Sequence, residues 1–212
     1  MTEAQAAYRR IRERILIAEY RPGAVLSEDE LTSDLGIGRT PVRDALQRLS
    51  HDGLVEIRPR QGTYVSQVTL DDLGEIFEAR AAIERAIGRV AIARSQRQLV
   101  EGLDALIAEA SGSDAEQSDV DTDAAFHELL LEGIRNRYLA ESYRRLLDAS
   151  VRLFYLTGCG MESPAALRAT LIAVRSAIAN ADSDALEIAL LDHLSAFRDR
   201  VSGSLFDGLR SA

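Results

Sequence analysis

Two short helical patterns near the amino terminus are separated by very few residues, and this spacing constrains the fold more than any other feature. Ser27 followed by Glu30 forms a capping box, which predicts a short helix that ends at Gly36. Only two further residues precede a second helical pattern at residues 39–52, where Pro41 is tolerated in the first turn. Two helices joined by so short a turn are typical of a helix-turn-helix.

The segments on either side of this pair complete a known order of elements. Apolar residues recur at helical spacing over residues 8–18, which predicts a helix before the pair. After it, two alternating segments at 55–57 and 63–65 predict a two-stranded ribbon. This order is that of winged helix-turn-helix domains, whose second turn helix enters the major groove of DNA. We therefore expect a DNA-binding domain at residues 1–69.

The helix predicted at residues 39–52 has two different faces. Its apolar face, which we expect to pack against the domain, consists of Val42, Ala45, Leu46 and Leu49. The candidate DNA contacts are on its polar face and at the ribbon tip: Arg39, Thr40, Arg43, Gln47, Arg60 and Gly62. Arginine can donate two hydrogen bonds to guanine or phosphate, and glycine lets the backbone approach DNA closely. The alternative is a merely solvated polar face, but the order of elements favours DNA binding.

The remaining sequence, residues 70–212, contains helical patterns and no strand pattern. Six helices are predicted, at residues 73–90, 99–107, 122–134, 137–157, 164–180 and 183–203. Six helices suffice for a compact bundle, so the fold class is mainly α with a small β-ribbon. Residues 1–69 contain 10 arginines and 10 acidic residues, whereas residues 70–212 contain 15 arginines and 24 acidic residues. We therefore expect nucleic acid to contact the first part only.

Three polar side chains in the helical part are candidate metal ligands. Asp123 and His127 lie four residues apart, which puts both on one face of a helix. His193 falls in an apolar stripe, where a histidine is expected to be largely buried. Such a set could bind a divalent cation, Zn²⁺ or Ni²⁺, and leave coordination positions open for a ligand. The alternative is that each histidine is a hydrogen-bonded core residue.

Arg80 interrupts the apolar stripe of the first long helix, and Glu84 follows one turn later. The two side chains could pair with each other. Arg80 could instead face a cavity and bind an anionic effector through two hydrogen bonds. The residues alone leave both alternatives open.

Other features exclude whole classes of protein. No apolar run approaches the roughly 20 residues of a membrane-spanning helix, and the amino terminus is charged where a signal peptide is apolar. The single cysteine, Cys159, cannot form an internal disulfide, which is typical of a reducing compartment. We therefore expect a cytoplasmic protein without a membrane partner.

Residues 21–65, RPGAVLSEDELTSDLGIGRTPVRDALQRLSHDGLVEIRPRQGTYV, resemble the DNA-binding domain of the GntR family of bacterial transcription regulators. The usual family pattern contains PG, then L.E..LA..LGVSRTPVR.AL, then GLV and a later glycine, and the RTPVRDAL core is highly specific. The resemblance implies DNA contact by Arg39, Thr40, Arg43 and the wing around Gly62. The family usually has serine where this chain has Gly38, so a hydroxyl that could contact phosphate is missing.

The helical part resembles the FCD (FadR-like) branch of the same family. In that branch the positions of Asp123 and His127 in DTDAAFHELLLEGIRNRYL, and of His193 in LLDHL, bind metal. The branch normally has a further histidine where this chain has Leu171, so three of four expected ligands remain and we expect weaker metal binding. The segment EARAAIE is similar to the VR..LE pattern of the branch, which favours an effector-binding role for Arg80.

Together these features predict a sequence-specific DNA-binding transcriptional regulator and not an enzyme. We expect residues 1–69 to bind a double-stranded operator and residues 70–212 to bind a carboxylate effector. We also expect a homodimer, because one DNA-reading domain contacts too few base pairs for useful specificity. Two alternatives stay open. The sensor could have degenerated into a dimerisation domain, or the three candidate ligands could form the site of a metal-dependent hydrolase.

Overall fold

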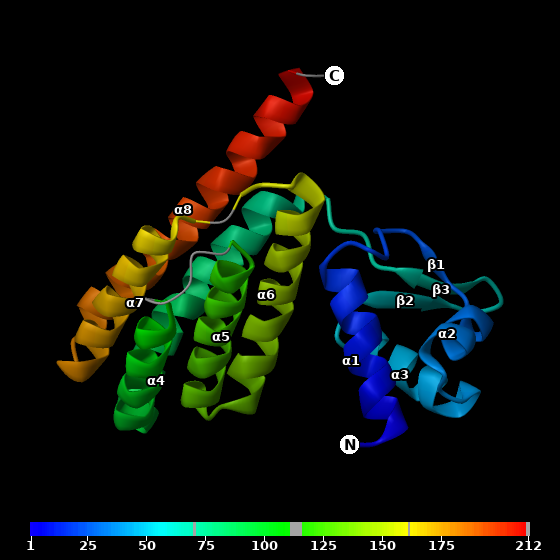
Figure 1. Cartoon of the computed structure of the whole chain (residues 1–212), viewed down its shortest axis with the longest axis horizontal. Coiled ribbons are helices and arrows are strands. Elements are labelled where there is room, and N and C mark those ends of the chain that lie inside the picture. The colour runs from blue at the N-terminus through cyan, green and yellow to red at the C-terminus, as the bar shows by residue number, and fades with distance from the viewer. Residues whose placement is uncertain (70, 111–115, 161, 211–212) are drawn as a thin grey trace. The chain divides into compact units, whose positions relative to one another are not determined.

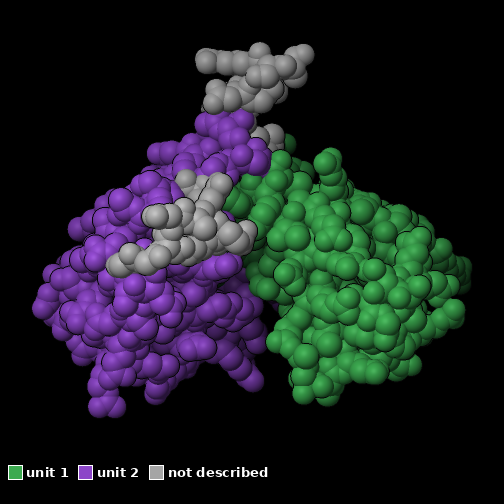
Figure 2. All heavy atoms as spheres, viewed as in Figure 1, with its two compact units in different colours: residues 1–73, 147–156 green, residues 74–146, 157–212 purple. Residues whose placement is uncertain are grey.

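Two compact units make up the computed structural model of the chain (Figure 2). The structure describes residues 1–69, 71–110, 116–160 and 162–210. The first unit comprises residues 1–73 and 147–156, and the second comprises residues 74–146 and 157–212. Each unit has buried apolar residues of its own, as expected of separate domains.

The first unit contains the expected helix-turn-helix and ribbon (Figure 1). Its elements are α1 (Glu3–Leu16), β1 (Val25–Leu26), α2 (Glu28–Leu35), α3 (Arg39–His51), β2 (Val55–Arg58) and β3 (Gly62–Val65). The strands form an antiparallel sheet in the order β1-β3-β2. The sequence predicts only β2 and β3, since the two residues of β1 are too few to show an alternating pattern.

The predicted start and end signals operate at the two ends of α2. The Ser27 hydroxyl accepts a hydrogen bond from the Glu30 backbone amide and so caps α2. Gly36 ends that helix with φ +65°, a left-handed conformation that glycine adopts without steric cost. Val42 and Leu49 of α3 are fully buried in the same core as Ile11 of α1. This packing fixes α3 so that its opposite face points to solvent.

The second unit is a helical bundle (Figure 1). Its helices are α4 (Asp72–Ala110), α5 (Glu116–Ile134), α6 (Arg137–Thr157), α7 (Pro164–Ala179) and α8 (Ser183–Arg210), although residues 147–156 of α6 are grouped with the first unit. The sequence predicts six helices here, but the described residues form five. The interruption predicted between residues 90 and 99 is present as a kink inside α4, since the intervening residues include no glycine or proline to end the helix.

A kink takes the place of that predicted break. Ser95 within α4 has non-helical angles, φ −145° and ψ 22°. The side chains beside it bind the ends of two other helices. Arg94 donates hydrogen bonds to the carbonyls of Ile134, the last residue of α5, and of Arg135, and Gln96 donates to the Ile178 carbonyl of α7. The kink therefore satisfies carbonyl groups that helix ends leave without an intrahelical partner.

The described helices include none that is both long enough and apolar enough to span a membrane.

Candidate functional site

The polar face of α3 is exposed along its whole length. Arg39, Thr40, Arg43 and Gln47 all lie at the surface, and we call these four residues the DNA-reading face. The N-cap residue Gly38 provides no side-chain hydrogen bond to α3. Its first amides therefore remain available to a phosphate oxygen, which a helix N-terminus attracts.

Two carboxylates of α2 pair with the arginines of the DNA-reading face. Glu28 accepts two hydrogen bonds from Arg43, at 3.1 Å from Nε and 2.7 Å from Nη2. Asp29 Oδ1 lies 2.9 Å from Nη2 of Arg39. The hydrogen bond from Arg43 lowers the pKa of Glu28 below its usual value. Both arginines are thus oriented by α2 while most of their surface remains open to solvent.

The wing, residues 55–65, presents its tip to solvent. Arg58 of β2 pairs with Gly62 of β3, so the turn between them is only three residues long. Arg60 and Gly62 have positive φ values of 62° and 117°, as a tight turn requires. The Arg58 guanidinium stacks 4.5 Å above the centre of the Tyr64 ring, which supports the tip from one side.

The three candidate metal ligands come together in the second unit. Asp123 and His127 extend from α5, and His193 extends from α8. One ligand atom from each lies within 4.8 Å of the other two, and we call these residues the metal cluster. Asp123 Oδ1 lies 3.1 Å from His193 Nε2, and its Oδ2 lies 3.8 Å from His127 Nε2. One carboxylate and two imidazoles suit Zn²⁺ or Ni²⁺, so the residues present fit the ion.

A chain of buried hydrogen bonds leads from α4 to His127. Arg80 donates to Glu84 Oε1 from both Nε and Nη2, at 3.1 and 2.8 Å. The Tyr143 hydroxyl of α6 lies 3.1 Å from the same Glu84 oxygen and 3.0 Å from Nδ1 of His127. The sequence leaves open whether Arg80 pairs with Glu84 or faces a cavity, and in the structure Arg80 pairs with Glu84.

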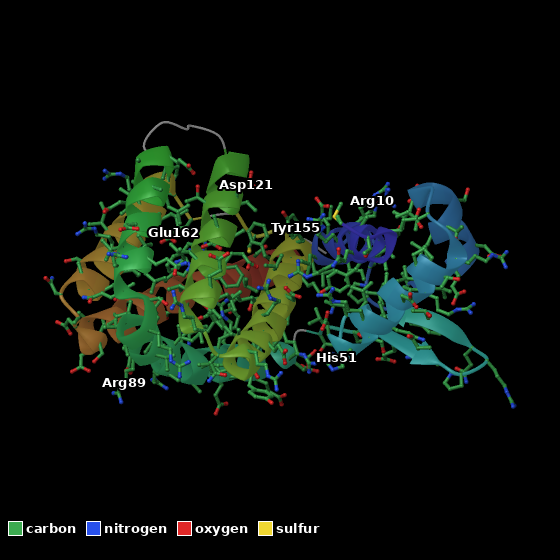
Figure 3. All side chains as sticks on the ribbon, turned by 90° about the horizontal axis from the view of Figure 1, so that it is seen from below. Arg10, His51, Arg89, Asp121, Tyr155 and Glu162 are labelled. Atoms are coloured by element: carbon green, nitrogen blue, oxygen red, sulfur yellow. The ribbon has the colours of Figure 1, made fainter. Side chains whose placement is uncertain are left out.

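The segment between α6 and α7 brings one more acidic side chain to the cluster. Glu162, labelled in Figure 3, has Oε2 3.4 Å from Nδ1 of His193. The His193 side chain is 6% exposed and that of Glu162 is 13% exposed. His193 therefore lies between two carboxylates, those of Asp123 and Glu162, in a mostly buried position.

Burial and these neighbours shift the pKa values of the two histidines in opposite directions. Burial lowers the pKa of His127 to about 3, and the charges of Arg80 and His193 reinforce this against Asp123. Burial alone would lower the pKa of His193 too, but Asp123 and Glu162 outweigh it and raise the pKa to about 9. Burial would raise the pKa of Asp123, but the two histidines and Arg80 lower it below its usual range. These two carboxylates therefore favour a positive charge at His193, as they would favour a bound cation.

Leu171 is completely buried in α7, among the apolar residues Leu167, Val174 and Ile178. The position where the resemblance implies a fourth ligand is therefore part of the hydrophobic core. The donor set that the described residues offer consists of one carboxylate and two imidazoles.

Four of the residues that contact these sites are not predicted by the sequence: Glu28, Asp29, Tyr143 and Glu162. A tyrosine inside an apolar stripe signals a buried hydroxyl that needs a partner, so Tyr143 could have been found. Glu28 and Asp29 look like ordinary first-turn acidic residues, which stabilise a helix N-terminus. Nothing in the sequence around Glu162 connects it to His193.

Two family models match the chain. Residues 3–65 match the model described as bacterial regulatory proteins, gntR family. Residues 75–196 match the FCD domain model. The first match covers the helix-turn-helix and the wing, and the second covers the metal cluster.

Similar proteins agree with these matches. The chain is 30% identical over 201 residues to the HTH-type transcriptional repressor RspR of Escherichia coli (strain K12), covering 93% of this chain and 88% of that protein. Its fold is similar to that of E. coli McbR/YncC, with a TM-score of 0.75, 19% identity and coverage of 97% and 99%. A GntR transcriptional regulator from Rhodococcus sp. RHA1 has a TM-score of 0.72, 22% identity and coverage of 96% and 99%.

Proposed function

The chain belongs to the GntR family of bacterial regulatory proteins and carries an FCD domain, and from this premise we propose that a bound effector controls its affinity for DNA. Membership of this family makes the chain a DNA-binding transcriptional regulator and not an enzyme. The proposal adds the residues that read DNA, the site that receives the effector, and a two-fold assembly.

We assign DNA contact to the DNA-reading face, Arg39, Thr40, Arg43 and Gln47, together with Arg60 and Gly62 of the wing. The observation that carries this assignment is that the polar face of α3 is exposed while its apolar face is fully buried. Arg43 and Gln47 lie four residues apart and can reach base edges together from one helix face. Thr40 and the uncapped start of α3 suit phosphate oxygens.

The test is selection of duplexes from a random library by the purified chain. We expect enrichment of a two-fold symmetric sequence that survives competitor DNA at moderate salt. Arg43→Ala and Gln47→Ala should each relax the base preference at particular positions of the duplex. Thr40→Ala should instead weaken binding to all duplexes alike, whatever their sequence. Failure to enrich any sequence would overturn the assignment.

For the sensor, we propose that the metal cluster binds a divalent cation, Zn²⁺ or Ni²⁺. Asp123, His127 and His193 would hold it, and when bound it would offer open coordination positions to a carboxylate effector. The main support for this proposal is that these three side chains, from α5 and α8, converge at a mostly buried position. Arg80 contributes through Glu84 and Tyr143, which orient His127.

Thermal shift measurements test the sensor directly. We expect Zn²⁺ or Ni²⁺ to raise the melting temperature of the wild-type chain, and small carboxylates to raise it further only when metal is present. His193→Ala should abolish metal uptake measured by elemental analysis. A wild-type chain that takes up neither ion after loading would favour the alternative in which the FCD domain serves dimerisation alone, which the buried Leu171 supports.

We further propose that the chain acts as a homodimer, because a single DNA-binding domain, which we call a head, contacts too few base pairs to recognise an operator. Effector binding would then favour one spacing of the two heads over another, with a coupling of roughly 1–3 kcal/mol. Light scattering after size exclusion should give twice the mass of the 212-residue chain. A monomer at micromolar concentration would contradict this assembly.

A further inference from the structure

Both histidines of the metal cluster have an acceptor at the ring nitrogen that does not face Asp123. His127 Nδ1 lies 3.0 Å from the Tyr143 hydroxyl, and His193 Nδ1 lies 3.4 Å from Glu162 Oε2. In each ring Nε2 instead lies near the Asp123 carboxylate, at 3.8 Å for His127 and 3.1 Å for His193. The two rings are therefore oriented alike, although they come from different helices.

Tyr143 determines which nitrogen of His127 carries a proton. A phenol has one proton to donate, and the Tyr143 hydroxyl lies 3.1 Å from the Glu84 carboxylate, which can only accept. Two hydrogen bonds from Arg80 hold that carboxylate in place. The Tyr143 oxygen must then accept from Nδ1–H of His127. This leaves the lone pair on Nε2, where a metal ion needs it.

Glu162 makes the corresponding contact with His193. In the part of the chain that the structure describes, Oε2 of Glu162 and Nδ1 of His193 have no hydrogen-bond partner elsewhere, and both atoms are buried. Buried polar atoms without partners are costly, so a small approach of the two would satisfy both at once. Glu162 is not one of the three mutually close ligands, so it lies behind a ligand and not beside the ion.

We propose that Tyr143 and Glu162 are the positioning residues of the metal site, each holding one histidine at Nδ1 so that both rings present Nε2 to the ion. The inference rests on the metal site proposed above. It explains how three ligands serve without the fourth that Leu171 replaces, because preoriented rings lose little freedom when the ion binds. It also connects Tyr143 of α6 and Glu162 to the metal site.

The first experiment titrates Co²⁺ into the metal-free full-length chain and follows its visible absorption. We expect Tyr143→Phe, which keeps the ring and removes the hydroxyl, to weaken Co²⁺ affinity roughly 10- to 100-fold. It should also alter the absorption band, because His127 can then carry its proton on Nε2. Tyr138→Phe is the matched control, since Tyr138 lies on the same helix and its side chain is exposed. Its affinity and spectrum should equal those of the wild type.

The second experiment separates a positioning role of Glu162 from direct ligation. Glutamine can still accept the Nδ1–H bond, so Glu162→Gln should keep most of the Co²⁺ affinity while Glu162→Ala loses roughly tenfold or more. Equal losses in the two variants would assign Glu162 to the ion itself and overturn the inference. Glu162 follows α6 and lies outside every helix, so these variants also decide the matter if Tyr143→Phe does not fold.

The outcomes distinguish this inference from the proposed function on which it rests. Wild-type chain that takes up no Co²⁺ or Zn²⁺ would overturn the metal site and the positioning roles together. Normal wild-type uptake with unchanged affinity in Tyr143→Phe and Glu162→Ala would overturn the positioning roles alone. A loss of melting temperature in the metal-free variants with unchanged Co²⁺ affinity and spectrum would show a purely structural role and would also overturn the inference.

Discussion

The two units use the same pair of side chains, an arginine and a glutamate, in opposite surroundings. In the first unit Arg43 and Glu28 pair across the helix-turn-helix, with side chains 61% and 33% exposed. In the second unit Arg80 and Glu84 pair within one helix, with side chains 3% and 1% exposed. The first pair connects two helices at the surface, whereas the second is closed within the bundle.

This difference in exposure separates two uses of one interaction. A surface ion pair contributes little to stability, because water already solvates both charges well. Arg43 can therefore exchange Glu28 for a phosphate or a guanine edge at low cost. A buried pair cannot exchange partners in this way, since either charge left alone in the interior is strongly unfavourable. The first pair suits recognition of a partner, and the second suits the maintenance of a fixed geometry around His127.

The largest expected effect follows from breaking the buried pair. Arg80→Met leaves the Glu84 carboxylate buried without its cation, which should destabilise the second unit by about 3–5 kcal/mol. Urea unfolding followed by circular dichroism should show an earlier transition for the helical bundle. The double variant Arg80→Met/Glu84→Gln removes both charges and should recover much of the loss. A single variant as stable as the wild type would remove the distinction between the two pairs.

The next effect concerns the exposed arginine and appears in DNA binding. Arg43→Ala should weaken binding to the selected duplex roughly 10- to 100-fold if the guanidinium reads a base, and leave unfolding nearly unchanged. Fluorescence anisotropy with the selected duplex gives the affinity. Arg48→Ala is the control, because Arg48 lies on the same helix but stacks 4.2 Å above the Tyr8 ring. Equal losses in both variants would indicate a general charge effect and not base reading.

The exposed region was the easier of the two to predict from sequence. Positions on a helix wheel determine which side chains face solvent, so Arg39, Thr40, Arg43 and Gln47 were placed on one face correctly. The capping residues and the glycines at turns likewise act locally and were read at the right places. Their partners on α2 were missed, because pairing between two helices depends on the angle at which they cross.

For the metal cluster, the sequence predicts the three candidate ligands but not the side chains that surround them. Asp123 and His127 share a helix face by spacing alone, and the apolar stripe around His193 correctly indicated burial. Tyr143 and Glu162 reach the cluster from other elements, and no local pattern encodes that approach. Between residues 90 and 99 the sequence indicates where α4 is interrupted but not that the interruption is a kink. Ser95 bends the helix without ending it, and neighbouring helix ends stabilise the bend.

A smaller effect tests whether Asp29 restrains Arg39. Asp29→Asn releases Arg39 to contact a phosphate, so affinity for duplexes of any sequence should rise a few fold. The slope of log affinity against log salt concentration should steepen by about 0.9, as for one added phosphate contact. Asp34→Asn is the matched control, since Asp34 lies on the same helix but pairs with Arg14 of α1. An equal gain in both variants would mean that net charge alone decides affinity.

The smallest effect is expected for Glu28→Gln, and the matching substitution in the buried pair, Glu84→Gln, provides the contrast. Glu28→Gln removes a charge at the surface, on a side chain that is 33% exposed, and should change the free energy of unfolding by less than about 1 kcal/mol. Glu84→Gln removes the charge that balances Arg80 in the interior and should destabilise the bundle by several times as much. Urea unfolding of both variants under identical conditions gives the comparison. Comparable losses would mean that exposure does not separate the two pairs, and Arg43 would then be held too firmly by Glu28 to exchange it for DNA.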